Sequence, residues 1–214
     1  MSLKNKLKQH FQEKSRSEKL AHFYSLFDKP VSTLDVGVSS LKYHQMRAPA
    51  NHFLKTFRFP PECYTGLAVD EVTGLPELYP GKRFVQYDGR VFPFSDREFT
   101  AVFSNAVVEH VGDDSRQLLF INEMLRVGGK VFFTTPNKWF PVETHTNALL
   151  RHWHDDSFFK WCEKHYSFFT KETLNLLSYS QLEGLMRRSD ASRYTIYKNR
   201  LLGSTLTFTV VCEK

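Results

Sequence analysis

Two acidic residues and a glycine stand where short apolar runs end, which is where open α/β proteins hold small ligands. Asp35 lies in the run that leads to Gly37, and Asp70 ends a second apolar run. A strand, a glycine turn and a helix bring the backbone close to a small cofactor, and a carboxylate after the second strand can accept both hydroxyls of a ribose. Each such bond contributes about 1.5–3 kcal/mol. The alternative is that Gly37 only turns the chain and that Asp70 caps a helix.

A second group of candidates follows the expected fifth strand. Glu143 and His145 stand on the segment that leaves it, and we expect both to contact the substrate. His145 is a candidate general base, because the pKa of an imidazole lies near neutrality. Structural hydrogen bonds within the loop explain both residues equally well. His110, which follows Glu109 after the fourth strand, is expected to be structural.

The sequence predicts no metal site. His152, His154 and Asp156 are of the types that bind metals. Histidines two positions apart, however, point to different faces of a helix. The chain has three cysteines, which are scattered and odd in number, as Cys63, Cys162 and Cys212. This usage indicates reduced thiols in a cytoplasmic protein rather than zinc ligands or a disulfide framework.

Apolar runs and helical segments alternate along the chain, which predicts a parallel α/β sheet with right-handed crossovers. The expected strands cover 31–36, 64–70, 83–89, 99–105 and 130–135. Two further strands, 194–198 and 205–211, are joined by a short connection and are therefore antiparallel. Helix is expected over 2–27 in two pieces, with a restart at a capping box from Ser15, over 44–57 with an interruption at Pro49, and over 170–188 with a capping box from Ser180.

Composition limits the classes of function. Hydrophobic residues make up 41% of the 214, so a sizeable core is expected, and no apolar run approaches the ~20 residues of a membrane span. The N-terminus lacks the apolar segment of a secretory signal. The formal charge of +6 is spread thinly, apart from a basic stretch near the N-terminus. A solvated helical face explains that stretch better than a nucleic-acid or membrane contact does.

Four stretches together resemble the class I S-adenosylmethionine-dependent methyltransferases of the small-molecule branch called type 11. They are Leu34–Gly37, Val69–Asp70, Phe92–Val111 and Met124–Asn137. The resemblance implies a Rossmann-like, mostly parallel seven-stranded sheet with an antiparallel C-terminal hairpin, and S-adenosylmethionine as the cofactor.

The resemblance also implies a role for individual residues. Asp35 and the backbone at Gly37 would hold the amino-acid end of the cofactor, and Asp70 would bind the ribose. The remaining contacts would be made by Asp88 and Gly89 at the adenine amino group, and by Asn105 and Ala106 beside the methionine arm.

The single domain is expected to contain an N-terminal helical segment (1–30), a cofactor-binding core (31–137), an aromatic substrate cap (138–169) and a final part with helices and the hairpin (170–214). All three tryptophans lie in the cap, so Trp139 joins Glu143 and His145 as a candidate substrate contact. The cap could instead serve packing or a dimer contact.

The expected activity is methyl transfer to a small molecule such as a sugar, a lipid-linked compound or a secondary metabolite, by a cytoplasmic monomer or homodimer. Nucleic acid is an unlikely partner, since no basic module is appended. Two alternatives stay open. One is an RNA or protein methyltransferase. The other is a non-catalytic cofactor-binding module, because Val38-Ser39-Ser40 replaces the further glycines that the family's loop usually carries.

Overall fold

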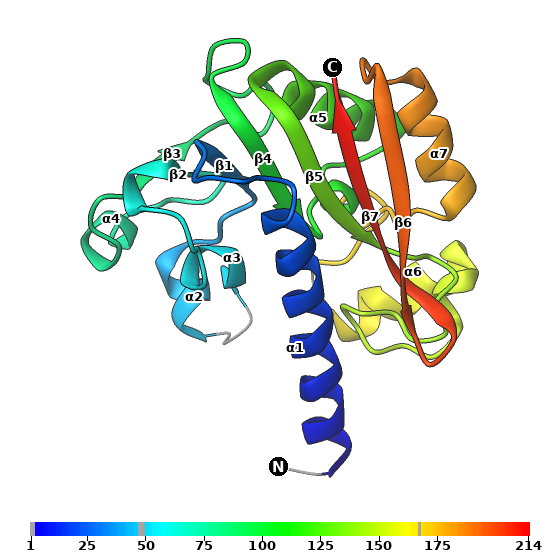
Figure 1. Cartoon of the computed structure of the whole chain (residues 1–214). Coiled ribbons are helices and arrows are strands. Elements are labelled where there is room, and N and C mark those ends of the chain that lie inside the picture. The colour runs from blue at the N-terminus through cyan, green and yellow to red at the C-terminus, as the bar shows by residue number, and fades with distance from the viewer. Residues whose placement is uncertain (1–2, 47–49, 167) are drawn as a thin grey trace.

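The computed structural model describes residues 3–46, 50–166 and 168–214. Seven strands form one sheet in the order β3-β2-β1-β4-β5-β7-β6 (Figure 1). Strands β1 to β5 run parallel, whereas β7 pairs antiparallel with β5 and with β6. The strands are β1 Thr33–Val36, β2 Tyr64–Ala68, β3 Arg83–Gln86, β4 Phe99–Asn105, β5 Gly128–Pro136, β6 Arg193–Leu201 and β7 Ser204–Glu213. This arrangement confirms the predicted Rossmann-like sheet with its antiparallel C-terminal hairpin.

Helices cover both faces of the sheet. They are α1 Leu3–Tyr24, α2 Leu41–Met46, α3 His52–Lys55, α4 Leu75–Leu78, α5 Asp114–Val127, α6 Asp155–His165 and α7 Tyr179–Arg188. Three short 3-10 turns complete the set, η1 Pro61–Cys63, η2 Val108–His110 and η3 Arg151–Trp153. Among the described residues, no helix has both the length and the apolar character needed to cross a membrane.

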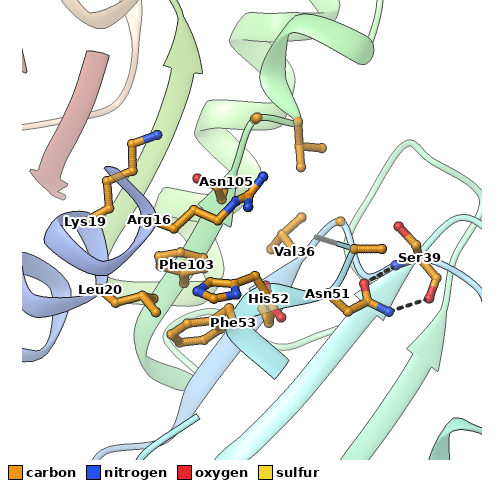
Figure 2. Close-up of a pocket in the computed structure, with 15 residues that line it drawn as sticks. Arg16, Lys19, Leu20, Val36, Ser39, Asn51, His52, Phe53, Phe103 and Asn105 are labelled. Carbon is orange, nitrogen blue, oxygen red and sulfur yellow. Dashed lines mark hydrogen bonds between the residues drawn. The ribbon is translucent and has the colours of Figure 1, made fainter. Parts of the chain in front are cut away.

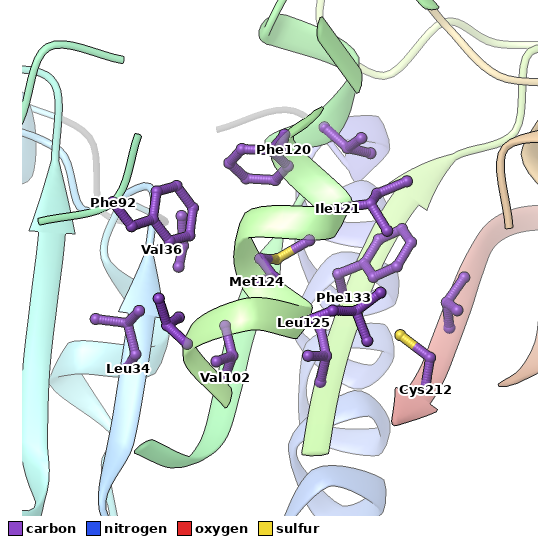
Figure 3. Close-up of a cluster of buried hydrophobic side chains, with 14 of the residues drawn as sticks. Leu34, Val36, Phe92, Val102, Phe120, Ile121, Met124, Leu125, Phe133 and Cys212 are labelled. Carbon is purple, nitrogen blue, oxygen red and sulfur yellow. The ribbon is translucent and has the colours of Figure 1, made fainter. Parts of the chain in front are cut away.

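One face of the sheet is closed by α5 and α7. Met124 and Leu125 of α5 are fully buried and lie against Val102 of β4 and Phe133 of β5 (Figure 3). Burial of each such side chain contributes about 1.5–3 kcal/mol. Successive side chains of a strand point to opposite faces of the sheet. Leu34 of β1 therefore lies on the face covered by α5 and α7, whereas Asp35 points to the opposite face.

The opposite face carries an aromatic core beneath α1 and α3. Phe23 of α1 is fully buried and makes edge contacts with Phe53, Phe103 and Phe132, at ring-centroid distances of 5.2, 5.3 and 5.7 Å. Phe53 and Phe103 stack at 4.0 Å. These contacts fix the C-terminal part of α1 on the sheet, beside the end of β1. The N-terminal part of α1 projects away from the rest of the chain (Figure 1).

Three helix predictions need correction. Residues 3–24 form one helix and not two pieces, because no proline or glycine interrupts them and the expected capping box at Ser15 lies inside the helix. Helix α7 starts at Tyr179 and not at residue 170, since the capping box is formed by Ser178 with Gln181 rather than by Ser180. The helix expected over 44–57 is represented by α2 and α3, and its interruption at 47–49 lies outside the described residues.

Candidate active site

Gly37 ends β1 with a backbone that other residues rarely adopt. Its φ is +98°, and a Cβ at this position would lie 2.3 Å from Cγ2 of Val107. The amides of Gly37 and Val38 both donate to the carbonyl oxygen of Leu67, at 3.0 and 3.1 Å. The turn therefore joins the carboxyl ends of β1 and β2, and it needs a glycine at this one position.

The residues after Gly37 are held without further glycines. Val38 is buried, and a Cβ on Gly66 would lie 3.0 Å from its Cγ2, so its side chain packs against the sheet. Ser39 is bound at both backbone groups by Asn51: its amide donates to Oδ1 of Asn51 at 2.8 Å, and its carbonyl accepts from Nδ2 at 2.9 Å (Figure 2). This side-chain clamp fixes the loop.

A cavity of about 200 Å³ lies under the loop, between α1 and the ends of β1 and β4. Asp35 lines it and accepts a hydrogen bond from the hydroxyl of Tyr64 at 2.5 Å. Burial raises the pKa of Asp35 from 3.8 to about 7, although the hydrogen bond from Tyr64 and the charge of Lys82 act to lower it. We refer to this space as the inner cavity.

Two basic residues of α1 also line the inner cavity. Figure 2 shows Arg16 and Lys19 entering from α1, while Asn51 clamps Ser39 on the other side. Lys19 is 9% exposed. Burial lowers the pKa of its ammonium to about 8, against the opposite effect of Glu109. Burial likewise lowers the pKa of Arg16. The inner cavity thus combines a buried acid with two cations.

A larger cleft of about 900 Å³ opens beside the inner cavity and shares Gly37, Ala106 and Arg16 with it. We call it the outer cleft. Asp70 follows β2 and lines one part of it, whereas the other part is lined by His110, His145 and a pair of aromatic rings, Phe168 and Phe169. The carboxyl ends of β1, β2 and β4 therefore meet at one cleft, as expected for an open α/β sheet.

Glu143 holds His145 in place. Its side chain is fully buried, and its carboxylate accepts from Nδ1 of His145 at 2.6 Å and from the amide and hydroxyl of Thr146 at 2.6 and 2.7 Å. Burial raises the pKa of Glu143, but the hydrogen bonds and the charge of His145 outweigh this and lower it to about 2. Burial lowers the pKa of His145, but the hydrogen bond to Glu143 and the charges of Glu143 and Glu109 outweigh that effect and raise it.

Comparison with known protein families agrees with this geometry. A sequence profile described as a methyltransferase domain matches residues 48–178, which is more than half of the chain. The chain belongs to the methyltransferase family. The match confirms the class I S-adenosylmethionine-dependent methyltransferase expected from the motifs, with S-adenosylmethionine as its cofactor. No curated protein sequence matches the chain.

Solved structures share the fold of this methyltransferase. A Pyrococcus horikoshii protein aligns with a TM-score of 0.58 at 14% identity, over 94% of this chain and 90% of that one. An S-adenosylmethionine-dependent methyltransferase from Methanosarcina mazei gives 0.55 at 16% identity, over 91% and 96%. The Burkholderia thailandensis 1,6-didemethyltoxoflavin N1-methyltransferase, solved with its acceptor and S-adenosylhomocysteine, gives 0.57 at 12% identity, over 94% and 78%.

Some predicted site residues of the methyltransferase lie apart from these two spaces. Asp88 and Gly89 are exposed after β3, where Asp88 accepts from the amide of Arg90 at 2.9 Å, and neither lines the inner cavity or the outer cleft. Trp139 is 51% exposed and makes an edge contact with Trp153 at 6.1 Å. Glu143 is buried behind His145 rather than lining the outer cleft.

The other predicted residues come together. Asp35, Gly37, Asn105 and Ala106 line the inner cavity, and Asn105 accepts from the hydroxyl of Thr134 at 2.8 Å through Oδ1. Ala106 has a φ of +57°, which turns the chain sharply after β4.

Sequence reasoning missed Arg16, Lys19, Asn51 and Tyr64. Arg16 and Lys19 are three residues apart, and they are followed by Leu20, which is buried in the structure. On a helix, this spacing places both cations at the edge of the packed face, so the sequence could have indicated them as site residues.

Proposed function

We propose that this methyltransferase binds S-adenosylmethionine across the carboxyl ends of β1, β2 and β4, with the amino-acid end in the inner cavity. That end carries one ammonium and one carboxylate. The inner cavity offers Asp35 for the first, and Lys19 with Arg16 for the second. Asp70 lines the outer cleft at the end of β2, where it can accept the ribose hydroxyls. Asp88 and Gly89 remain the proposed contacts of the adenine amino group.

The short loop is compatible with this binding mode. Gly37 lets the backbone approach the cofactor, and Val38 directs its side chain into the core rather than across the loop. The clamp from Asn51 keeps the backbone at Ser39 in one conformation. A fixed loop lowers the entropic cost of ordering it around a ligand. These contacts favour a binding-competent enzyme over a module that has lost its cofactor.

We propose a small-molecule hydroxyl as the acceptor, bound in the part of the outer cleft between His145 and the pair Phe168 and Phe169. The volume of the outer cleft, about 900 Å³, lies within the range of about 300–1,000 Å³ that is usual for small-molecule sites. A small-molecule acceptor is also what the Burkholderia enzyme of this fold binds. Trp139, half exposed outside this cleft, would contribute only to a larger acceptor.

His145 is the group proposed to activate the acceptor. S-adenosylmethionine supplies an electrophilic methyl group, and a neutral hydroxyl becomes a good nucleophile only when it loses its proton. His145 lines the outer cleft, and Glu143 fixes the orientation of its ring from behind. Holding the acceptor, the methyl group and the base together in reactive geometry contributes about 7–11 kcal/mol in favourable cases. Free thiols at all three cysteines support the expected cytoplasmic location.

The meeting of Gly37, Asp70 and Ala106 with His145 at one cleft carries the proposal. Calorimetric titration with S-adenosylmethionine and S-adenosylhomocysteine tests its first half. We expect micromolar binding to the wild type, a loss of about tenfold or more in Asp70→Ala, and no change in Asp28→Ala, which alters an exposed acid away from the cleft. Wild-type protein that is folded, free of carried-over ligand and unable to bind either compound would overturn it.

Formation of S-adenosylhomocysteine in an acceptor screen tests the second half. The screen contains small hydroxyl compounds, total RNA and protein extracts. We expect turnover with small hydroxyl compounds and a strong loss of it in His145→Ala. Turnover with RNA or protein alone would show that the acceptor is a macromolecule and would overturn the proposed small-molecule acceptor. Cofactor binding without turnover on any acceptor would favour the non-catalytic module. Size-exclusion chromatography with light scattering distinguishes between a monomer and a homodimer, the two states expected.

A further inference from the structure

Three metal-ligand side chains converge at the wall of the outer cleft. One carboxylate oxygen of Glu109 and one ring nitrogen each of His110 and His145 lie within 4.8 Å of one another. Glu109 and His110 belong to η2, the 3-10 turn after β4, whereas His145 lies on the segment after β5. The fold brings them together because β4 and β5 are neighbours in the sheet.

Glu109 has an oxygen that the protein leaves unsatisfied. Its side chain is fully buried, and Oε2 accepts from the hydroxyl of Thr135 at 2.9 Å. Oε1 has no hydrogen-bond partner within the described part of the chain, and it lies 3.9 Å from Nε2 of His145. An unpaired buried charge of this kind is costly, so a cation beside Oε1 would stabilise the site. Lys19 forms no ion pair with Glu109 among the described residues, although the charge of Glu109 acts to raise the pKa of Lys19.

The two imidazoles present lone pairs to each other. Nδ1 of His110 faces the carbonyl oxygen of Thr173 at 2.9 Å, and Nδ1 of His145 faces the carboxylate of Glu143 at 2.6 Å. Both partners only accept, so both Nδ1 atoms carry hydrogens, and each neutral ring keeps its lone pair on Nε2. The two Nε2 atoms are 3.0 Å apart. Two lone pairs at this distance repel unless a proton lies between them or one metal ion binds both.

A proton between the two Nε2 atoms would not satisfy the whole cluster. A proton on Nε2 of His145 would point to His110 and leave Oε1 of Glu109 without a partner, since that oxygen is 3.9 Å away. One cation can bind all three atoms at once. Glu143 and the carbonyl of Thr173 then act as the outer partners that metal-binding histidines almost always have at their second nitrogen.

We propose that Glu109, His110 and His145 bind a divalent first-row transition metal such as Zn²⁺, Co²⁺ or Mn²⁺. Two imidazoles with one carboxylate favour these ions over Mg²⁺ and Ca²⁺, which prefer oxygen ligands. Three protein ligands also leave open positions, as in catalytic metal sites. Because His110 and His145 line the outer cleft, these positions face the space proposed for the acceptor.

The role of the metal rests on the proposed function and deepens it by changing one step. With Nε2 bound to the metal and Nδ1 bonded to Glu143, His145 has no free lone pair, so the metal replaces it as the group that activates the acceptor. An acceptor hydroxyl bound to the metal would lose its proton to water more readily, because a divalent cation lowers the pKa of a bound hydroxyl. The alkoxide oxygen then forms a bond to the methyl carbon as the carbon–sulfur bond breaks, and the electron pair of that bond leaves with the neutral sulfur. The acceptor class narrows accordingly to compounds whose hydroxyl oxygen can bind a metal.

Cobalt titration tests the site. Protein without a histidine tag is freed of metal with a chelator and titrated with CoCl₂, and visible absorption and calorimetry are followed. We expect one Co²⁺ per chain with d–d bands in the wild type and in His154→Ala, a matched exposed histidine. Glu109→Gln and His145→Ala should weaken binding by more than about 100-fold. His110→Gln provides a further variant if either of these fails to fold, and MgCl₂ should not compete.

Wild-type protein that binds no Co²⁺ would overturn the proposal, and so would binding that persists unchanged in Glu109→Gln and in His145→Ala. Titration of the same samples with S-adenosylmethionine separates this failure from failure of the proposed function. Cofactor binding without Co²⁺ binding would overturn the proposed metal site and leave the proposed function intact. Co²⁺ binding without cofactor binding would retain the metal site and remove the methyltransferase chemistry.

Discussion

Tyr64 donates its hydroxyl hydrogen to the carboxylate of Asp35 at 2.5 Å, across the paired strands β1 and β2 and inside the aromatic core beneath α1. The hydroxyl satisfies part of a carboxylate that is only 7% exposed. It leaves the rest of the acid facing the inner cavity, where a ligand ammonium would complete its environment. The burial of this acid lowers the stability of the fold at the proposed cofactor site.

The cost of this acid should appear in the pH dependence of stability. Burial raises the pKa of Asp35 from 3.8 to about 7, so the folded protein holds a proton there that the unfolded chain has lost. Stability therefore falls as the pH rises from about 4 to about 7 and stays low above that. In cofactor-free protein, the stability of Asp35→Asn relative to wild type should increase by about 2 kcal/mol between pH 5 and pH 8. Urea denaturation at both pH values measures it, and an equal difference at both would contradict the expectation.

A methyl group at Gly37 should impair both folding and cofactor binding. Gly37→Ala combines a φ of +98° with a Cβ 2.3 Å from Val107. We expect a loss of about 1–3 kcal/mol of stability and a weaker affinity for S-adenosylmethionine by calorimetry. Gly184→Ala is the matched control. Gly184 lies in α7 with nothing within 4 Å of its added Cβ, so this variant should gain up to about 1 kcal/mol and bind normally. Equal behaviour of the two variants would argue against a special role of the turn.

The sheet could be predicted from sequence because each strand carries its own local signal. The expected bounds of β4, 99–105, match the structure, and the acids Asp35 and Asp70 mark the carboxyl edge correctly. Helix boundaries were less predictable. Ser15 and Ser180 both begin sequences that suit a capping box, but a helix without a breaker continues through Ser15, and Ser178 caps α7 first.

The site could be predicted only where it depends on one stretch of chain. Gly37 and Asp70 follow strands, so their edge of the sheet was evident. Pairings between distant segments were not evident: Tyr64 with Asp35, and His110 with His145, are joined by the packing of neighbouring strands and of the loops that follow them. Spacing along the chain cannot reveal a ligand cluster whose members are 35 residues apart. Along the sequence, His152 and His154 with Asp156 stand close enough together to suggest metal ligands, but they are not the cluster that the fold assembles.

Arg126 should contribute measurably to the stability of the segment that contains Phe92 and Phe94. Its guanidinium donates to both oxygens of Glu123, at 2.7 and 2.8 Å, and to the carbonyls of Phe92 and Phe94, at 2.9 and 2.8 Å. A lysine cannot reproduce this fork, so Arg126→Lys should lose about 1.5–3 kcal/mol in chemical denaturation. Arg193→Lys is the control, because Arg193 is 77% exposed in its surface ion pair and should cost less than about 1 kcal/mol. Similar losses of stability in both variants would show that the fork geometry of Arg126 does not contribute more than a surface ion pair does.

Glu143 should act on the proposed metal through His145 rather than by direct contact. Its carboxylate holds Nδ1 of His145 at 2.6 Å and ties the same loop to Thr146. Glu143→Gln keeps the size of the side chain and removes the charge that makes the imidazole a stronger ligand. We expect the affinity for Co²⁺ to fall about 10–100-fold, with shifted d–d bands and an unchanged affinity for S-adenosylmethionine. Glu163→Gln, an exposed acid on α6, should change neither. A purely structural role of Glu143 would instead lower thermal stability and leave the cobalt spectrum and affinity of the folded fraction as in the wild type.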